Sequence, residues 1–334
     1  MSGPPAFVTG ASGFLGRKLV AALAAAGREV FVLGHRRPLG APQPGITVVE
    51  GALEDPAAWR PALAAGCTVF HLAAVRAAPG VRRAELLRIN SEAAGALAAA
   101  ALAARAGRFV LVSTAWTHGS SGAAGRPRSE EDPPEALALA SAYVASKVEG
   151  ARRIAEAAAR GLPAVTVSPG IVFGLPLPGS ANRLAAHARR VLASRLAPTI
   201  GAGRRLRSVV CGDDVVAGLL AAERAGEPGR EYVLVGGDLS HRGFDRAVLA
   251  AAGRRGIAPR VPAGAVRRAA RVVDGLAGYD RGSGYRAAVE ALDAEWRFDG
   301  ARAARELGFR PTPLAESIGR MVRGLLAADG EAPA

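Results

Sequence analysis

The sequence predicts a doubly wound α/β fold, in which helices cover both faces of a parallel sheet. Two observations lead to this prediction. Short runs rich in Val, Ile and Phe alternate with Ala-rich helical runs through the first half of the chain, and a glycine-rich turn joins the first run to the first helix. Strands that alternate with helices in this way pair in parallel, and ligands bind outside their carboxyl ends.

Six strands are expected before residue 170: Ala6–Thr9, Val30–Leu33, Ile46–Val49, Thr68–His71, Phe109–Ser113 and Ala164–Ser168. Helices are expected near 14–26, 56–65, 84–106 and 137–160. A further strand–helix unit covers 207–238, with Val209-Val210, a helix over 213–225 and a strand over Tyr232–Val235. We therefore expect a nucleotide-binding domain made of residues 1–174 and 207–238. A smaller, mostly helical domain, made of residues 175–206 and 239–334, would bind the substrate.

The bulk composition argues against several classes of protein. With only Cys67 and Cys211, the 334 residues cannot form a disulfide scaffold, and a reducing compartment is expected. The five histidines are scattered without metal-ligand spacing, which predicts no metal: they are His35, His71, His118, His187 and His241. The N-terminus lacks a signal-peptide layout, and the most apolar run, Ala93–Ala104, is too short to span a bilayer. We expect a soluble, cytoplasmic protein with no membrane partner.

The formal net charge of +14 invites a nucleic-acid-binding interpretation. However, the arginines are spread along Ala-rich helices and do not interleave with aromatic residues, which form only 5% of the chain. The sequence therefore predicts no nucleic-acid partner. An anionic cofactor or substrate could use part of the charge.

A glycine loop follows the first strand and opens the first helix, and it predicts dinucleotide binding. Its glycines permit a tight turn and a close approach to phosphates, and the helix N-terminus then faces a pyrophosphate. The residues expected to bind the cofactor here are Gly10, Ser12, Gly13, Phe14, Leu15 and Gly16.

The end of the second strand favours NADP(H) over NAD(H). An acidic residue at this place would bind the adenosine ribose of NAD, but Glu29 precedes the strand and is badly placed. The strand is instead followed by His35, Arg36 and Arg37, whose cationic groups suit a 2′-phosphate.

Tyr143 and Lys147 lie four residues apart in a predicted helix and therefore share one of its faces. Lys18 and Lys147 are the two lysines among 43 basic residues, so a lysine at this place is notable in an arginine-rich chain. An ammonium beside a phenol lowers the pKa of the phenol, which can then exchange a proton with a carbonyl or alcohol oxygen.

Together with the glycine loop, this pair resembles the extended short-chain dehydrogenase/reductase family. Further segments match in the family's order over nearly the whole chain: Val69–Ala74, Arg88–Asn90, Phe109–Thr114, Asp132–Pro134, Ser168–Gly174, Arg207 with Asp213–Val215, Trp296–Asp299 and Ala304–Pro311.

The resemblance implies a role for each matching residue. Tyr143 would be the general acid/base, Lys147 would tune it and bind the nicotinamide ribose, and Thr114 would hydrogen-bond the substrate oxygen. Ser113 is the neighbouring candidate, but strand alternation allows only one of the two to face the site, and the family spacing selects Thr114. Further cofactor contacts are implied at Ala52, Leu53, Leu72, Ala73, Ala74, Asn90, Ser113, Pro169, Gly170, Ile171 and Val172.

Departures from the family pattern narrow the reaction. Family dehydratases carry an acidic pair after the Thr, whereas Ala115 and Trp116 stand here. Many nucleotide-sugar members have Arg where this chain has Ser168, and members often have Asp near the adenine where Ala52 stands. The chain looks closer to dihydroflavonol reductases, 3β-hydroxysteroid dehydrogenases and 3-keto acid reductases. Arg207 remains open between a phosphate contact and a surface arginine.

We therefore expect an NADP(H)-dependent oxidoreductase that interconverts a ketone and a secondary alcohol on a small, fairly apolar substrate. A nucleotide-sugar epimerase of the same family is the alternative, and a non-catalytic nucleotide-binding sensor is a remote one. Substrate specificity is expected in residues 75–82, 116–128, 174–206 and 239–290, where loops can vary without disturbing the scaffold. The resemblance also suggests that the helices near 84–106 and 137–160 pair between two copies of the chain in a homodimer.

Overall fold

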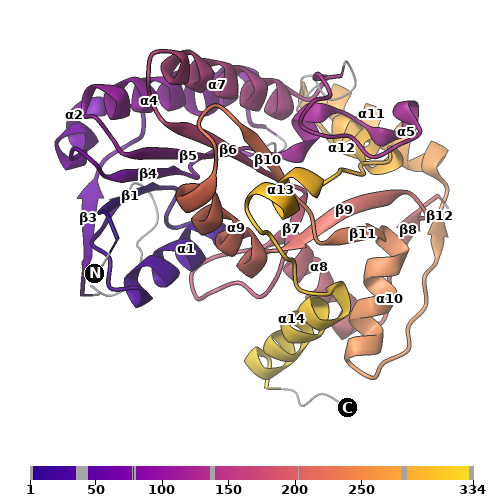
Figure 1. Cartoon of the computed structure of the whole chain (residues 1–334). Helices are drawn as coiled ribbons and strands as arrows, with labels where there is room; N and C mark the ends of the chain where they lie inside the picture. The colour runs from indigo at the N-terminus through magenta and orange to yellow at the C-terminus, as the bar shows by residue number, and fades with distance from the viewer. Residues whose placement is uncertain are drawn as a thin grey trace.

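A computed structural model of the chain describes residues 3–34, 44–76, 78, 80–135, 140–201, 203–279 and 284–330, except for the side chains of 123, 124, 286–288 and 291. Its centre is a seven-stranded sheet in the order β10-β6-β5-β4-β1-β2-β3, and every strand pair in it is parallel (Figure 1). The strands are β1 Ala6–Thr9, β2 Val30–Gly34, β3 Ile46–Glu50, β4 Thr68–His71, β5 Arg108–Val112, β6 Ala164–Pro169 and β10 Glu231–Leu234. The predicted fold class is confirmed.

Each central strand is buried on both faces, because successive side chains enter opposite cores. In β1, Val8 packs in the core beneath α1 (Phe14–Ala25) and α9 (Gly212–Ala225), whereas Phe7 packs beneath α4 (Ala94–Ala103) and α7 (Ala142–Ala159). The two pairs of helices lie on opposite sides of the sheet (Figure 1). This double burial explains the continuous apolar runs of the sequence.

Between β3 and β5 the chain forms α2 (Pro56–Trp59), the short 3₁₀ turn Arg60–Ala62, β4 and α3 (Arg83–Leu87). A π-helical segment, Arg88–Ala93, joins α3 to α4. The helix expected near 137–160 begins at Ala142, where the Ser141 hydroxyl accepts a hydrogen bond from Val144 N at 3.4 Å. Residues 136–139 lie outside the described ranges.

The remaining residues form a second layer of structure beside the carboxyl edge of the sheet. A three-stranded sheet, ordered β11-β9-β7, consists of β7 Ile171–Phe173, β9 Leu206–Cys211 and β11 Gly237–Ser240. Helices α8 (Arg183–Ser194), α10 (His241–Ala251) and α14 (Leu314–Ala328) share a third core with it. The two-residue strands β8 (Thr199–Ile200) and β12 (Arg260–Val261) pair in parallel.

The remaining helices are α5 Ser121–Ala124, α11 Ala263–Ala277, α12 Tyr285–Asp293 and α13 Ala301–Glu306, with a 3₁₀ turn at Ala115–His118. Strands β7, β8, β11 and β12 were not among the strands expected from the sequence. Within the described ranges, no helix combines the length and apolarity that crossing a membrane requires.

Candidate active site

The glycine loop lies between the carboxyl ends of β1 and β4, where the strand order reverses and an open α/β sheet forms its ligand crevice. Gly10 has φ +73°, and a Cβ there would lie 2.6 Å from Ala73 N. A Cβ at Gly16 would lie 2.1 Å from Gly10 O. Both positions therefore require glycine, the first for its backbone conformation and the second for the contact of α1 with the loop.

The N-terminus of α1 is suited to an anion. Gly13 is its N-cap and is exposed, and no side chain within the described residues caps the helix there. The amides of the first turn therefore face outward with the positive end of the helix dipole. Ser12 is half-buried beside them, while Phe14 and Leu15 pack inward, Phe14 against Gly212 and Leu15 against the core. The residues present fit a dinucleotide pyrophosphate.

Thr9 and His71 fix the ends of these two strands. Thr9 Oγ1 lies 2.7 Å from His71 Nδ1, and it accepts a hydrogen bond from Ala73 N at 3.3 Å. Burial, followed by the positive charge of Lys147, lowers the pKa of His71 to about 3, so this histidine is neutral at physiological pH.

Asn90 clamps the loop that follows β4. Its amide exchanges two hydrogen bonds of 2.8 Å with the backbone of Val75 and donates a third to Ser146 Oγ at 3.0 Å. Gly150 allows α7 to lie against the π-helical segment, because a Cβ there would lie 2.1 Å from Asn90 O. The buried Asn90 thus ties the crevice loop to the helix that carries the predicted catalytic pair.

Lys147 extends from α7 to the end of β5, where its Nζ donates a hydrogen bond of 2.8 Å to Val112 O. The side chain is 5% exposed, and this burial lowers its pKa from 10.5 to about 8. Thr114 lies two residues beyond Val112, so the fold brings the segment that carries Thr114 and the helix that carries Lys147 together at one strand end.

Tyr143 lies one turn before Lys147 and is half-buried against a core cluster that contains Ala115, Trp296 and Phe298. Its pKa is raised by burial, against the opposing charges of Arg76 and Arg183. The sequence predicts a phenol whose pKa is lowered by Lys147, and the structure shows the opposite shift. The physical reason is desolvation, which disfavours the phenolate and which residue spacing does not report.

Thr114 is the extended N-cap of the 3₁₀ turn Ala115–His118, and its Oγ1 accepts a hydrogen bond from Trp116 N at 3.4 Å. Ser113 is 7% exposed, and its backbone N–H binds Val167 O at 2.8 Å. Trp116 stacks on Trp296, with ring centroids 4.2 Å apart and an interplanar angle of 7°. The segment after Thr114 therefore carries a stacked pair of indole rings, which we call the aromatic wall.

The segment after β6 crosses into the three-stranded sheet. Gly170 passes close to β9, since a Cβ there would lie 2.6 Å from Ser208 O. Pro169 is buried, while Ile171 and Val172 are half-buried in β7. Buried Ser168 hydrogen-bonds Glu231, which also contacts His118 Nε2 at 3.1 Å. Ser168 is therefore part of a polar network inside the protein.

The other predicted cofactor contacts differ in where they lie. Leu72, Ala73 and Ala74 follow β4 and are half-buried at the crevice, and Ala52 is half-buried after β3. The side chain of Leu53 packs in the core around Trp59. The residues predicted to select NADP(H), which are His35, Arg36 and Arg37, lie outside the described residues.

Arg207 is 8% exposed rather than a surface arginine, and one of its Nη atoms donates to Leu292 O. Its Nε is buried and has no hydrogen-bond partner among the described residues. Arg207 is the second residue of β9, which is buried continuously from Arg207 to Cys211, whereas Arg204 and Arg205 before the strand are exposed.

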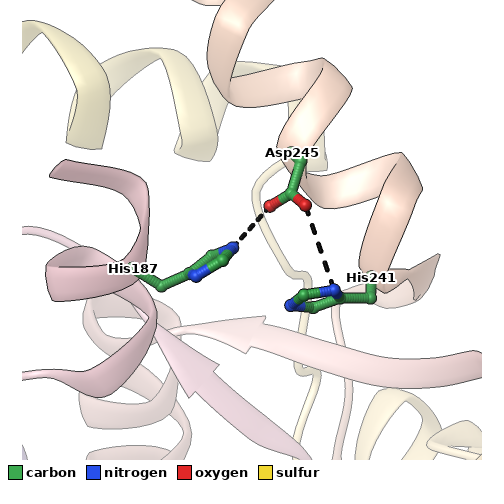
Figure 2. A group of neighbouring side chains, drawn as sticks. All are labelled: His187, His241 and Asp245. Carbon is green, nitrogen blue, oxygen red and sulfur yellow. Dashed lines mark hydrogen bonds and ion pairs between the residues drawn. The ribbon is translucent and has the colours of Figure 1, made fainter. Parts of the chain in front are cut away.

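Three further features escaped the sequence interpretation. Trp296 faces Trp116 from 180 positions away, and the charges of Arg76 and Arg183 act on Tyr143. A third feature, a cluster of His187, His241 and Asp245, joins α8 to α10 (Figure 2). Burial lowers the pKa of His241, as do the charges of His187 and Arg207, while Asp245 opposes them.

Comparison with known proteins gives two sequence matches. The family model described as "NAD dependent epimerase/dehydratase family" matches residues 6–235. A 4-hydroxy-2-methyl-3-oxo-4-farnesyl-3,4-dihydroquinoline-1-oxide ketoreductase from Stigmatella aurantiaca is 30% identical over 313 residues, which are 91% of this chain and 91% of that protein.

Solved structures share the whole fold. The protein gox2253 has a TM-score of 0.80 and 22% identity, covering 98% of this chain and 99% of its own. MoeE5, solved in complex with UDP-glucuronic acid and NAD, has a TM-score of 0.74 and 26% identity, covering 97% of this chain and 99% of its own. The likeness extends over both the seven-stranded sheet and the structure beside it.

Proposed function

Because this chain belongs to the NAD dependent epimerase/dehydratase family, we propose that it is an NADP(H)-dependent ketoreductase acting on a small, fairly apolar substrate. The observation that carries the proposal is the stack of Trp116, two positions after Thr114, on Trp296. It puts an aromatic surface where an acid needed to expel water would stand, and an aromatic surface favours an apolar ketone. The ketoreductase relative supports the same reaction class.

In the direction of reduction, Tyr143 donates its hydroxyl proton to the ketone oxygen, and Thr114 Oγ1 holds that oxygen by a hydrogen bond. Lys147, anchored on Val112 O, would hold the ribose of the cofactor, and its positive charge would stabilise the phenolate left on Tyr143. The nicotinamide, when bound, would supply the hydride. One hydride and one proton thereby convert the ketone into a secondary alcohol.

The cofactor would be held by the glycine loop and by Lys147. Asn90 would contribute indirectly, because it fixes the loop that follows β4. The preference for NADP(H) rests on His35, Arg36 and Arg37, whose positive charges suit a 2′-phosphate, and on the absence of an acidic residue at the end of β2 in the sequence.

The experiment is a spectroscopic assay of NADPH and NADH consumption with purified protein and a panel of ketones. The panel should include aromatic ketones with an isoprenoid chain, because the ketoreductase relative is named for a farnesyl-bearing quinoline oxide. Ketone-dependent NADPH oxidation, lost in Tyr143→Phe, is the expected result. Cofactor binding without turnover on any ketone or sugar nucleotide would favour the non-catalytic sensor.

A nucleotide-sugar epimerase is the second candidate, and buried Arg207 is the observation that favours it. Its Nε has no partner among the described residues, and a diphosphate would supply one. MoeE5, which is solved with a UDP-sugar, has the same fold. An epimerase retains its cofactor, so NAD(H) released only on denaturation, together with interconversion of UDP-sugars without net cofactor consumption, would favour this candidate.

A further inference from the structure

His187, His241 and Asp245 come together where two helices of the structure beside the sheet meet. His187 stands on α8, and His241 and Asp245 stand one turn apart on α10, with all three side chains pointing toward one another (Figure 2). His187 Nε2 lies 2.6 Å from Asp245 Oδ1, and His241 Nδ1 lies 3.9 Å from Asp245 Oδ2. The three ligand-type atoms lie within 4.8 Å of one another.

The carboxylate of Asp245 is incompletely satisfied. Its side chain is 3% exposed, and its Oδ2 is buried without a hydrogen-bond partner among the described residues. A buried carboxylate oxygen that makes no hydrogen bond is costly, by about 1–3 kcal/mol or more. The oxygen faces the ring of His241, so the unmet acceptor and two imidazoles share one small space.

We propose that His187, His241 and Asp245 bind a divalent first-row transition-metal ion such as Zn²⁺, through one imidazole nitrogen from each histidine and the Asp245 carboxylate. Imidazole nitrogens and a carboxylate are the ligands that Zn²⁺ takes beside thiolates. The ion would satisfy Asp245 Oδ2 and would bridge α8 to α10. The sequence predicts no metal because its histidines lack metal-ligand spacing. The fold nevertheless brings together His187 and His241, which are 54 positions apart in the sequence.

The distances suit a small ion after slight side-chain rotation. Ligand atoms bound tetrahedrally at about 2.1 Å from Zn²⁺ lie roughly 3.4 Å apart. The present separations of 2.6 and 3.9 Å fall on either side of that value. Metal binding would replace the hydrogen bond between His187 and Asp245 by two bonds to the ion, which requires the unprotonated nitrogen of each ring.

The surroundings also suit a partly accessible site with one open coordination position. The side chains of His187 and His241 are 18% and 31% exposed, so an ion can reach them from solvent. The centroid of the Phe244 ring lies 6.4 Å from that of His187, so an apolar side chain stands beside the cluster. The positive charge of Arg207 acts on His241 and would also repel a metal cation. It would therefore lower the affinity for the ion without changing the arrangement of the ligands.

The test is calorimetric titration of Zn²⁺ into the untagged, chelator-treated full chain at about pH 8, where protons compete least with the metal. One equivalent should bind, and saturating Zn²⁺ should raise the melting temperature. Titration with Co²⁺ should give the strong visible absorption that distinguishes a four-coordinate Co²⁺ site from a six-coordinate one. Cys67 and Cys211 are both buried, so thiol binding does not compete in the folded protein.

The variants are His187→Gln, at a partly exposed position, and Asp245→Asn, which keeps the side-chain shape. Each should weaken Zn²⁺ binding at least about tenfold and abolish the rise in melting temperature. Glu316→Gln on α14 removes an exposed carboxylate outside the cluster and should bind Zn²⁺ as the wild type does. The proposal is overturned if the wild type binds no Zn²⁺, or if His187→Gln, shown by circular dichroism to be folded, binds it with unchanged affinity.

Discussion

The indole of Trp116 lies flat against that of Trp296, with 4.2 Å between ring centroids and 7° between ring planes. Trp296 is 2% exposed, and an isolated parallel bridge holds its backbone against Arg207 on β9. A residue from the C-terminal third of the chain therefore sets the orientation of the residue two positions after Thr114. The stack gives Tyr143 a rigid, apolar neighbour, which would orient the apolar ketone that we propose as the substrate.

Replacing Trp116 by Ala should raise the KM for an apolar ketone about tenfold while changing kcat much less. Losing some 60 Å² of apolar contact corresponds to roughly 1.5 kcal/mol, or about one factor of ten in affinity. Steady-state kinetics with the best ketone of the panel measure both constants. Trp116→Phe keeps a ring and should stay within about threefold of wild type. An unchanged KM in Trp116→Ala would exclude this wall from substrate binding.

Tyr143→Phe should lower kcat by about 10²–10⁴-fold, because the substrate oxygen loses its proton donor. The fold should survive, since the ring still packs against the cluster that contains Ala115, Trp296 and Phe298 and only the hydroxyl is removed. Thermal melts of wild type and variant check the second statement.

Tyr285→Phe is the matched control, because Tyr285 is 47% exposed at the start of α12. It makes the same chemical change and should leave kcat unaltered. Near-normal turnover by Tyr143→Phe would remove Tyr143 from the role of general acid.

The NADP(H) preference is predicted to depend on Arg36 and Arg37. Changing both to Ala should raise the KM for NADPH by about 10²–10⁴-fold, since each charge-assisted hydrogen bond contributes about 1.5–3 kcal/mol and two are removed. The KM for NADH should stay nearly constant. Arg204 and Arg205 form a second adjacent arginine pair, exposed before β9, and their double Ala variant should alter neither constant. A clear preference of the wild type for NADH would refute the assignment.

Local sequence patterns were sufficient for the sheet and the glycine loop. The apolar runs of β1 to β6 and β10 agree with the structure within about two residues, because burial on both faces leaves a continuous signal in each strand. The loop at Gly10 and Gly16 was equally readable, because its conformation and its closeness to the backbone exclude other residues.

What the sequence could not show depends on long-range neighbours. Strand β11 has no apolar alternation, and it forms because β9 pairs with it. The contact between His187 and Asp245 spans 58 positions, and no spacing rule reports it. The pKa of Tyr143 was predicted in the wrong direction, because the i, i+4 spacing does not report the burial that raises this pKa.

Lys147 should make the protein more stable as the pH rises from about 8 to about 10.5. Burial lowers the pKa of Lys147 from 10.5 to about 8 in the folded chain. In that window the unfolded chain binds a proton that the folded chain does not, so the free energy of unfolding increases with pH. Below about pH 8 both states carry the proton and the contribution is constant. The full rise is at most on the order of 3 kcal/mol.

Urea denaturation at about pH 7, 8.5 and 10 measures this contribution in wild type and in Lys147→Met, which keeps a side chain of similar length. The stability of the wild type relative to this variant should increase with pH, because the variant lacks the titrating group. Lys18→Met removes the other lysine, which pairs with Asp213 at 2.7 Å, and leaves Lys147 in place. It should keep the wild-type rise. Parallel profiles for wild type and Lys147→Met across the range would contradict a lowered pKa at Lys147.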